Sequence, residues 1–109
     1  MGEQEVPLSE ETQKFTDEIE ALHEQGRVFE KPGRMSSSGE AYEAVERLAR
    51  SLGRDIRRVA EATGDEDAWV EWTLIYNMTI IIRVRLNGCY GVGGYNLSNK
   101  SCTYYGIVC

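Results

Sequence analysis

The stretch TLIYNMTIIIRVRLNG, residues 73–88, decides the fold class. Every second side chain is apolar over 73–86, which is the period of a β-strand with one buried face. Asn87-Gly88 follows directly and favours a hairpin turn, because both turn positions tolerate positive φ. We therefore predict a strand over 73–86 that enters a β-hairpin. Since the segment is long for one strand, a bend near Asn77 or a helical start is the alternative. The apolar face holds Leu74, Tyr76, Met78, Ile80, Ile82, Val84 and Leu86.

The tail that follows this turn, residues 89–109, holds four Tyr, four Gly, three Cys and a single charged residue, Lys100. Within it CYGV (89–92) and CTYYGIV (102–108) are typical of strands, and YNLSNKS (95–101) is typical of a turn. A tail that pairs with the preceding strand and packs against it is expected to carry little charge. We therefore predict that residues 73–108 form an antiparallel β-hairpin or small sheet.

Upstream of Thr73 the sequence has the period of helices. Residues 9–25 predict a first helix, in which Ser9 is the N-cap and Gly26 ends the last turn. Its apolar stripe is narrow, which suits a helix packed on one side only. The stripe consists of Phe15, Ile19 and Leu22.

Two further helices are predicted before the strand. Ser37 and Glu40 have the spacing of a capping box and begin a second helix, which ends at Gly53. Asp55 can cap a short third helix that ends at Gly64.

The predicted fold class is thus α+β, with three helices followed by a C-terminal antiparallel β-hairpin or small sheet. A chain of 109 residues has room for a single domain. It divides into a flexible N-terminus (1–8), an acidic helical part (9–64) and an uncharged β part (73–108). The predicted core is Phe15, Ile19, Leu22, Val45, Leu48, Leu52, Ile56, Val59, Trp69, Leu74, Ile80, Ile82, Val84 and Ile107.

The charged residues are also divided between the helical part and the β part of the chain. Residues 1–71 hold eighteen acidic and nine basic side chains, a net −9, whereas 72–109 hold three basic and no acidic ones, a net +3. An acidic protein is repelled by nucleic acid and by anionic membranes unless it presents a local basic patch. No segment predicts a membrane span or a signal peptide. We expect a cytoplasmic protein whose Cys89, Cys102 and Cys109 are thiols.

Catalysis is poorly supported, and we predict that the protein is not an enzyme. The single histidine, His23, lies among glutamates in the first predicted helix, with nothing nearby to suggest a nucleophile. Twelve and six residues separate the cysteines, so the close pairs of a zinc site are missing. We accordingly expect no metal, no cofactor and no small-molecule substrate.

Docking on another protein is the leading functional hypothesis. The predicted sheet contains MTIII (78–82) and no acidic residue that would deter pairing with another chain. Tyrosine supplies contact area at low entropic cost. The hypothesis is a small acidic, non-enzymatic interaction or regulatory protein that binds a partner or a second copy of itself through its C-terminal sheet. The predicted contacts are Ile81, Tyr90, Tyr95, Tyr104 and Tyr105.

The stretch ERLARSLGRDIRRVAEAT, residues 46–63, supports a second hypothesis. Two predicted helices joined at Gly53 resemble a helix-turn-helix motif, and the stretch holds five of the twelve basic residues. The resemblance implies a DNA-binding regulator. The side chains that it would place on DNA are Arg50, Arg54, Arg57 and Arg58.

The dipeptide Gly93-Gly94 supports a third hypothesis. An acidic front and an uncharged tail rich in Ser, Thr, Cys and Gly resemble the leader and core of a ribosomally made, post-translationally modified peptide. Its core would be residues 95–109, released by cleavage after the double glycine. Thioether rings would form by attack of a cysteine thiolate on a dehydrated Ser or Thr. The modified pairs would be Ser98 with Cys102 and Thr103 with Cys109.

Overall fold

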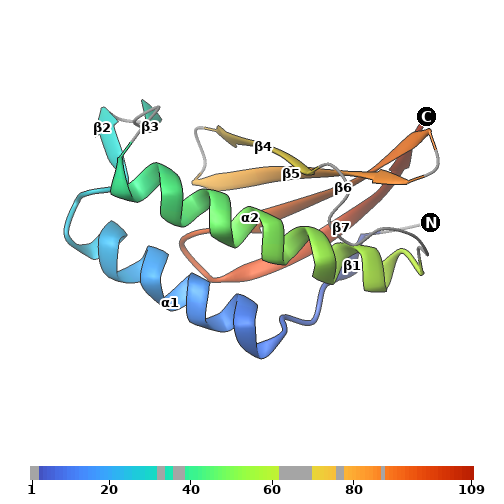
Figure 1. The fold of residues 1–109 in the computed structure, drawn as a ribbon, viewed down its shortest axis with the longest axis horizontal. Helices are drawn as coiled ribbons and strands as arrows, with labels where there is room; N and C mark the ends of the chain where they lie inside the picture. Colours follow the sequence, from blue (N-terminus) through green and yellow to red (C-terminus); the bar gives the residue numbers. More distant parts are fainter. Residues whose placement is uncertain (1–2, 32–33, 36–38, 62–69, 76–77, 87) are drawn as a thin grey trace.

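Two helices pack on one face of a five-stranded antiparallel sheet in the computed structural model of this chain (Figure 1). The structure describes residues 3–31, 34–35, 39–61, 70–75, 78–86 and 88–109. The elements in chain order are β1 (Gln4–Glu5), α1 (Glu10–Glu24), β2 (Phe29–Lys31), β3 (Arg34–Met35), α2 (Glu40–Val59), β4 (Val70–Ile75), β5 (Thr79–Leu86), β6 (Cys89–Asn96) and β7 (Ser101–Val108).

The main sheet has the strand order β1-β7-β6-β5-β4, and β2 and β3 form a separate small hairpin. The first strand of the chain pairs with the last, Gln4 opposite Tyr104 and Glu5 opposite Thr103. The α+β class is therefore confirmed. The predicted arrangement is wrong, because the described part of the chain holds two long helices and a five-stranded sheet rather than three helices and a terminal hairpin.

The predicted long strand over 73–86 is two strands. β4 and β5 pair with each other, Thr73 opposite Ile81 and Leu74 opposite Ile80. Direct partners lie on the same face of a sheet, so the alternation continues unbroken from one strand into the next. This is why the sequence period did not reveal the turn. Asn77, where a bend was the alternative, lies outside the described residues.

The predicted hairpin after β5 is confirmed. β5 ends at Leu86 opposite Cys89, the first residue of β6, so the turn between them spans two residues. Cys89 is also joined by a disulfide bond to Cys109, with their Cα atoms 4.3 Å apart, and Cys102 is a buried free thiol. The prediction of three thiols is thus wrong for two of them. The bond ties the start of β6 to the chain end just beyond β7.

Gly53 does not end the second helix, which runs without a break from Glu40 to Val59. A Cβ atom at Gly53 would lie 2.8 Å from Cγ2 of Val70 and 3.2 Å from Cγ1 of Val84. Glycine therefore lets α2 approach β4 and β5 closely, and tertiary packing outweighs its low helix propensity. The predicted third helix is wrong for the same reason, since Asp55 lies inside α2.

The structure confirms the predicted N-cap of α1 but not that of α2. Ser9 is the N-cap of α1, and its hydroxyl accepts a hydrogen bond from the backbone N–H of Thr12 at 3.3 Å, as predicted. The N-cap of α2 is Gly39, with no side-chain capping bond. Ser37, Gly64 and Trp69 lie outside the described residues.

The core lies between α2 and the sheet. The fully buried face of α2 packs on alternate residues of β5, and Tyr95 of β6 is 1% exposed. Ile107, predicted for the core, is 56% exposed instead. The N-terminus is not wholly flexible, since Val6 is buried and its backbone N–H donates to the carbonyl of Cys102 at 2.9 Å. The central buried residues are Val45, Leu48, Leu52 and Ile56 of α2 with Ile80, Ile82 and Val84 of β5.

Neither of the two long helices combines the length and the apolar run needed to cross a lipid bilayer, among the residues that the structure describes.

Candidate functional site

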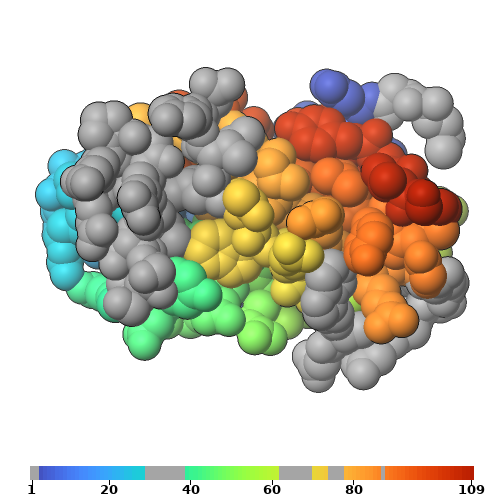
Figure 2. Space-filling model, turned by 90° about the horizontal axis from the view of Figure 1, so that it is seen from above, coloured from blue at the N-terminus to red at the C-terminus, as the bar shows by residue number. Residues whose placement is uncertain are grey.

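The face of the sheet that points away from the helices, called the outer face below, is the candidate site. No described helix covers it, and Figure 2 looks down on β5, β6 and β7 from this side. Because Ile80, Ile82 and Val84 point toward α2, the residues between them point outward, together with their partners in β4, β6 and β7. The outer face consists of Glu71, Thr73, Ile81, Arg83, Arg85, Tyr90, Val92, Gly94, Thr103, Tyr105 and Val108, with Glu5 of β1 as the partner of Thr103.

Tyr105 is held on this face by a β-bulge. Val92 pairs with Gly106 and Gly93 pairs with Tyr104, which leaves Tyr105 as the extra residue of β7. Its ring lies against Gly94, where a Cβ atom would come within 2.5 Å of the phenolic oxygen. The ring is nevertheless 42% exposed. The outer face therefore presents a fixed aromatic side chain that has half of its surface available for contact.

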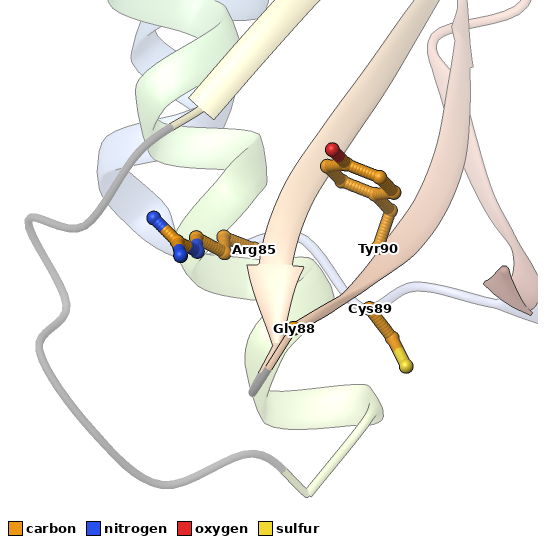
Figure 3. A pocket seen from close by; sticks show the side chains of 4 residues that line it. All are labelled: Arg85, Gly88, Cys89 and Tyr90. Atoms are coloured by element: carbon orange, nitrogen blue, oxygen red, sulfur yellow. The ribbon is translucent and has the colours of Figure 1, made fainter. Parts of the chain in front are cut away.

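Tyr90 and Arg85 are direct partners on the outer face, and Val108 lies opposite Tyr90 on the other side. Tyr90 is 41% exposed and Val108 is 57% exposed. A hollow of about 370 Å³ lies at this end of the sheet, lined by Arg85, Gly88, Cys89 and Tyr90. Figure 3 shows Arg85 and Tyr90 extending from neighbouring strands, with Cys89 pointing away from both.

The outer face carries the basic side chains Arg83 and Arg85 and the acidic side chains Glu5 and Glu71. Arg83 is paired with Glu71, its direct partner in β4, with an N–O distance of 2.9 Å. Arg85 makes no ion pair with any described residue. The acidic excess of the helical layer lies on α1, which carries six acidic side chains and one lysine. The outer face thus lacks the acidic excess of the helical layer and carries exposed tyrosines.

Three of the five predicted docking residues, Ile81, Tyr90 and Tyr105, lie together on the outer face. Tyr95 and Tyr104 do not, because they are 1% and 8% exposed and point toward the helices. Burial raises the pKa of Tyr95 to about 12, while a hydrogen bond with Thr16 opposes the shift. Burial also raises the pKa of Tyr104. Tyr95 and Tyr104 are therefore core residues, and their prediction as docking residues is wrong.

The helix-turn-helix interpretation is wrong for the described residues, because α2 is continuous across the expected turn. Its arginines are also engaged within the protein. Arg57 is 8% exposed, and the other three form ion pairs with acidic side chains. These pairs are Arg50 with Glu46, Arg54 with Glu11 and Arg58 with Asp55.

The fold also argues against the precursor hypothesis. Gly93 and Gly94 are buried in the middle of β6, so cleavage after them requires the sheet to open. Cys102 is buried, and Cys109 is bonded to Cys89 on the far side of the proposed cleavage point. Ser98 lies exposed in the turn before β7, and Thr103 lies within that strand on the outer face.

A buried polar cluster was missed by the sequence analysis. The carboxylate of Asp55, 1% exposed, accepts hydrogen bonds from the Thr12 hydroxyl at 2.6 Å and the Ser9 backbone N–H at 3.1 Å. Arg58 also donates to it, and the Thr12 and Ser51 hydroxyls are hydrogen-bonded to each other. An acceptor at the N-terminus of α1 satisfies N–H and O–H groups there and suits the helix dipole. The cluster therefore joins the two helices.

Metal binding finds no support in the described residues, which contain no group of three or more His, Cys, Asp or Glu side chains that could hold an ion. The geometry thus defines a two-layer α+β protein in which no described helix covers the outer face of the sheet. Comparison with protein-family models, with curated proteins and with solved structures finds no match to this chain.

Proposed function

We propose that this protein docks, through the outer face of its sheet, on a protein partner whose surface is acidic and partly apolar. The observation that carries the proposal is the set of exposed Tyr and Val side chains beside Arg85 on a face that no described helix covers. Tyr and Arg are the residues enriched at the energetic centres of protein interfaces. Strands hold them in place, so little conformational entropy is lost on binding.

A partner with an acidic group complements Arg85, which makes no ion pair with any described residue. The acidic helix α1 repels such a partner from the opposite layer. The partner is therefore expected to approach the sheet.

A non-enzymatic, regulatory role is part of this proposal. The cytoplasmic location expected from the sequence stays a prediction. Since disulfide bonds persist mainly in oxidising environments, the Cys89–Cys109 bond favours a compartment of that kind.

Site-specific photo-crosslinking in the native host tests the docking face. We expect a photoreactive amino acid at Ile81 or Thr103 to capture one partner protein, and the same group at Glu43 or Gln25, exposed on the helical side, to capture none. The partner is then purified, and its affinity for Tyr105→Ala and for the control Glu43→Ala is measured by calorimetry. We expect Tyr105→Ala to weaken binding about 30-fold, the effect of an interface hot spot, and the control to leave it unchanged.

Three results would contradict the proposal. Capture from the helical side alone would place the interface on the helices rather than on the outer face of the sheet. Capture of only the chain itself, supported by a dimer in analytical ultracentrifugation, would make the outer face a self-association surface. Equal affinities for Tyr105→Ala and wild type would show that the captured protein does not use the outer face.

A further inference from the structure

We infer that the hollow beside Arg85 binds an aspartate or glutamate side chain of the partner. The inference rests on the proposed docking function and names the chemistry at one end of the outer face. Six arginines in the described part of this protein form ion pairs with its own acidic side chains. The arginines with ion pairs are Arg27, Arg47, Arg50, Arg54, Arg58 and Arg83.

Arg85 differs from those six arginines, since it has no acidic neighbour among the described residues. It is exposed at the end of β5, and residues 72–109 contain no acidic side chain. Arginine presents a planar fork of N–H donors that matches a carboxylate with two parallel hydrogen bonds. Its charge is thus directed at solvent in a protein whose net charge is −6.

The hollow gives this guanidinium group a defined surrounding. Tyr90 lies opposite Arg85 on the next strand, and the backbone of Gly88 forms the wall at the turn. Cys89 lies in the same wall, and its bond to Cys109 keeps β6 and β7 together at this end. A carboxylate at the hollow would therefore bind Arg85, on a hairpin that the disulfide bond ties to the chain end.

The same row of residues sets a spacing for the partner. Val108 lies two strands from Arg85, with Tyr90 between them. Neighbouring strands are about 4.8 Å apart, which places the apolar contact about 10 Å from the charged one. A partner segment in the polyproline II conformation rises about 3.1 Å per residue with three residues per turn, so an acidic and an apolar side chain three positions apart lie on the same side, about 9 Å apart, and fit the row. The matching sequence is Asp or Glu, two residues of any kind, then Val, Ile or Leu.

Titration by ¹H–¹⁵N NMR at low salt tests the inference directly on the full chain. The probes are the blocked peptide acetyl-Glu-Ser-Ser-Leu-amide and its matched control acetyl-Gln-Ser-Ser-Leu-amide. We expect the Glu peptide to shift the signals of the Arg85 side chain, Gly88 and Tyr90 with a Kd in the millimolar range, and the Gln peptide to bind at least fivefold more weakly. Arg85→Gln should remove the difference, whereas Arg50→Gln, on α2, should preserve it.

The following results would overturn the inference. Absence of shifts up to 10 mM peptide, or equal shifts with both peptides, would exclude carboxylate recognition at the hollow. Inorganic phosphate is titrated separately, and saturation by phosphate without a response to the Glu peptide would make the hollow a small-anion site. A partner captured from Ile81 that binds Arg85→Gln as tightly as wild type would refute the inference while leaving the docking function intact. Peptide binding without any captured partner would support carboxylate binding at the hollow and contradict the docking function.

Discussion

Asp55→Ala is expected to destabilise the fold strongly, because the carboxylate of Asp55 joins the N-terminus of α1 to α2. The substitution leaves the Thr12 hydroxyl and the Ser9 backbone N–H without their acceptor. Hydrogen bonds to a charged group contribute about 1.5–3 kcal/mol each, so losing two of them costs about 3–6 kcal/mol. Ser9 is only partly buried, and water can replace part of its bond. We therefore expect a decrease of about 3–4 kcal/mol in the free energy of unfolding.

Urea unfolding followed by circular dichroism measures this decrease. With a slope near 1.5 kcal/mol per M urea, the midpoint should fall by about 2 M. Asp55→Asn keeps an acceptor oxygen and should cost less, about 1–2 kcal/mol. The control is Asp17→Ala, whose side chain is 73% exposed and paired with Lys100, and it should change stability by less than about 0.5 kcal/mol. A loss below about 1 kcal/mol for Asp55→Ala would show that the cluster does not hold the two helices together.

Three further predictions concern the sheet. The double variant Cys89→Ser/Cys109→Ser opens a loop of sequence separation 20 and should lose about 3 kcal/mol in urea unfolding, and an unchanged midpoint would contradict this. Burial raises the pKa of Cys102 to about 12, so a thiol reagent at pH 8 should modify no cysteine in the folded protein and one in urea. One reactive thiol in the folded state would refute that protection. Tyr95 has a folded pKa of about 12 against 10.0, so the stability it contributes is complete below pH 10 and falls by about 3 kcal/mol between pH 10 and 12. Tyr95→Phe should remove this pH dependence, and equal slopes for both proteins would contradict the assignment.

The elements that the sequence predicted correctly are those defined by neighbouring residues. Ser9 caps α1 through the N–H three residues on, and the hairpin after Leu86 is built by the two residues that follow it. Both features depend on backbone conformations that a few adjacent side chains select. No distant contact is needed to produce them.

The docking surface could be predicted only in part. Tyr104 and Tyr105 are adjacent and identical in type, yet one is buried and the other is 42% exposed. The pairing of β7 with β6 sets which of them faces the helices, and Gly106, at positive φ beside the bulge, is a local mark of the irregularity but not of the face that each tyrosine takes. The same holds for Tyr95, whose position opposite Ile80 places it in the core.

Gly53 shows how packing can overrule a local rule. A glycine after an apolar helical stretch is the usual mark of a helix end. Here the residue lies where α2 comes closest to β4 and β5, and its missing side chain makes that approach possible. The arginines that follow are thereby kept on one long helix, which excludes the helix-turn-helix geometry.

The sequence by itself determined the α+β class, the first helix, the two-residue hairpin turn and the division of charge between the two halves of the chain. These follow from periodicity, capping residues and composition, which act over a few residues. Only the tertiary structure decided that β1 joins β7, that Cys89 meets Cys109, and that Tyr90 and Tyr105 remain on the outer face while Tyr95 and Tyr104 are buried. Each of these depends on strand register and on which side of the sheet the helices cover. Both are set by contacts between residues far apart in the chain, because a strand with apolar side chains on both faces can be buried on either one.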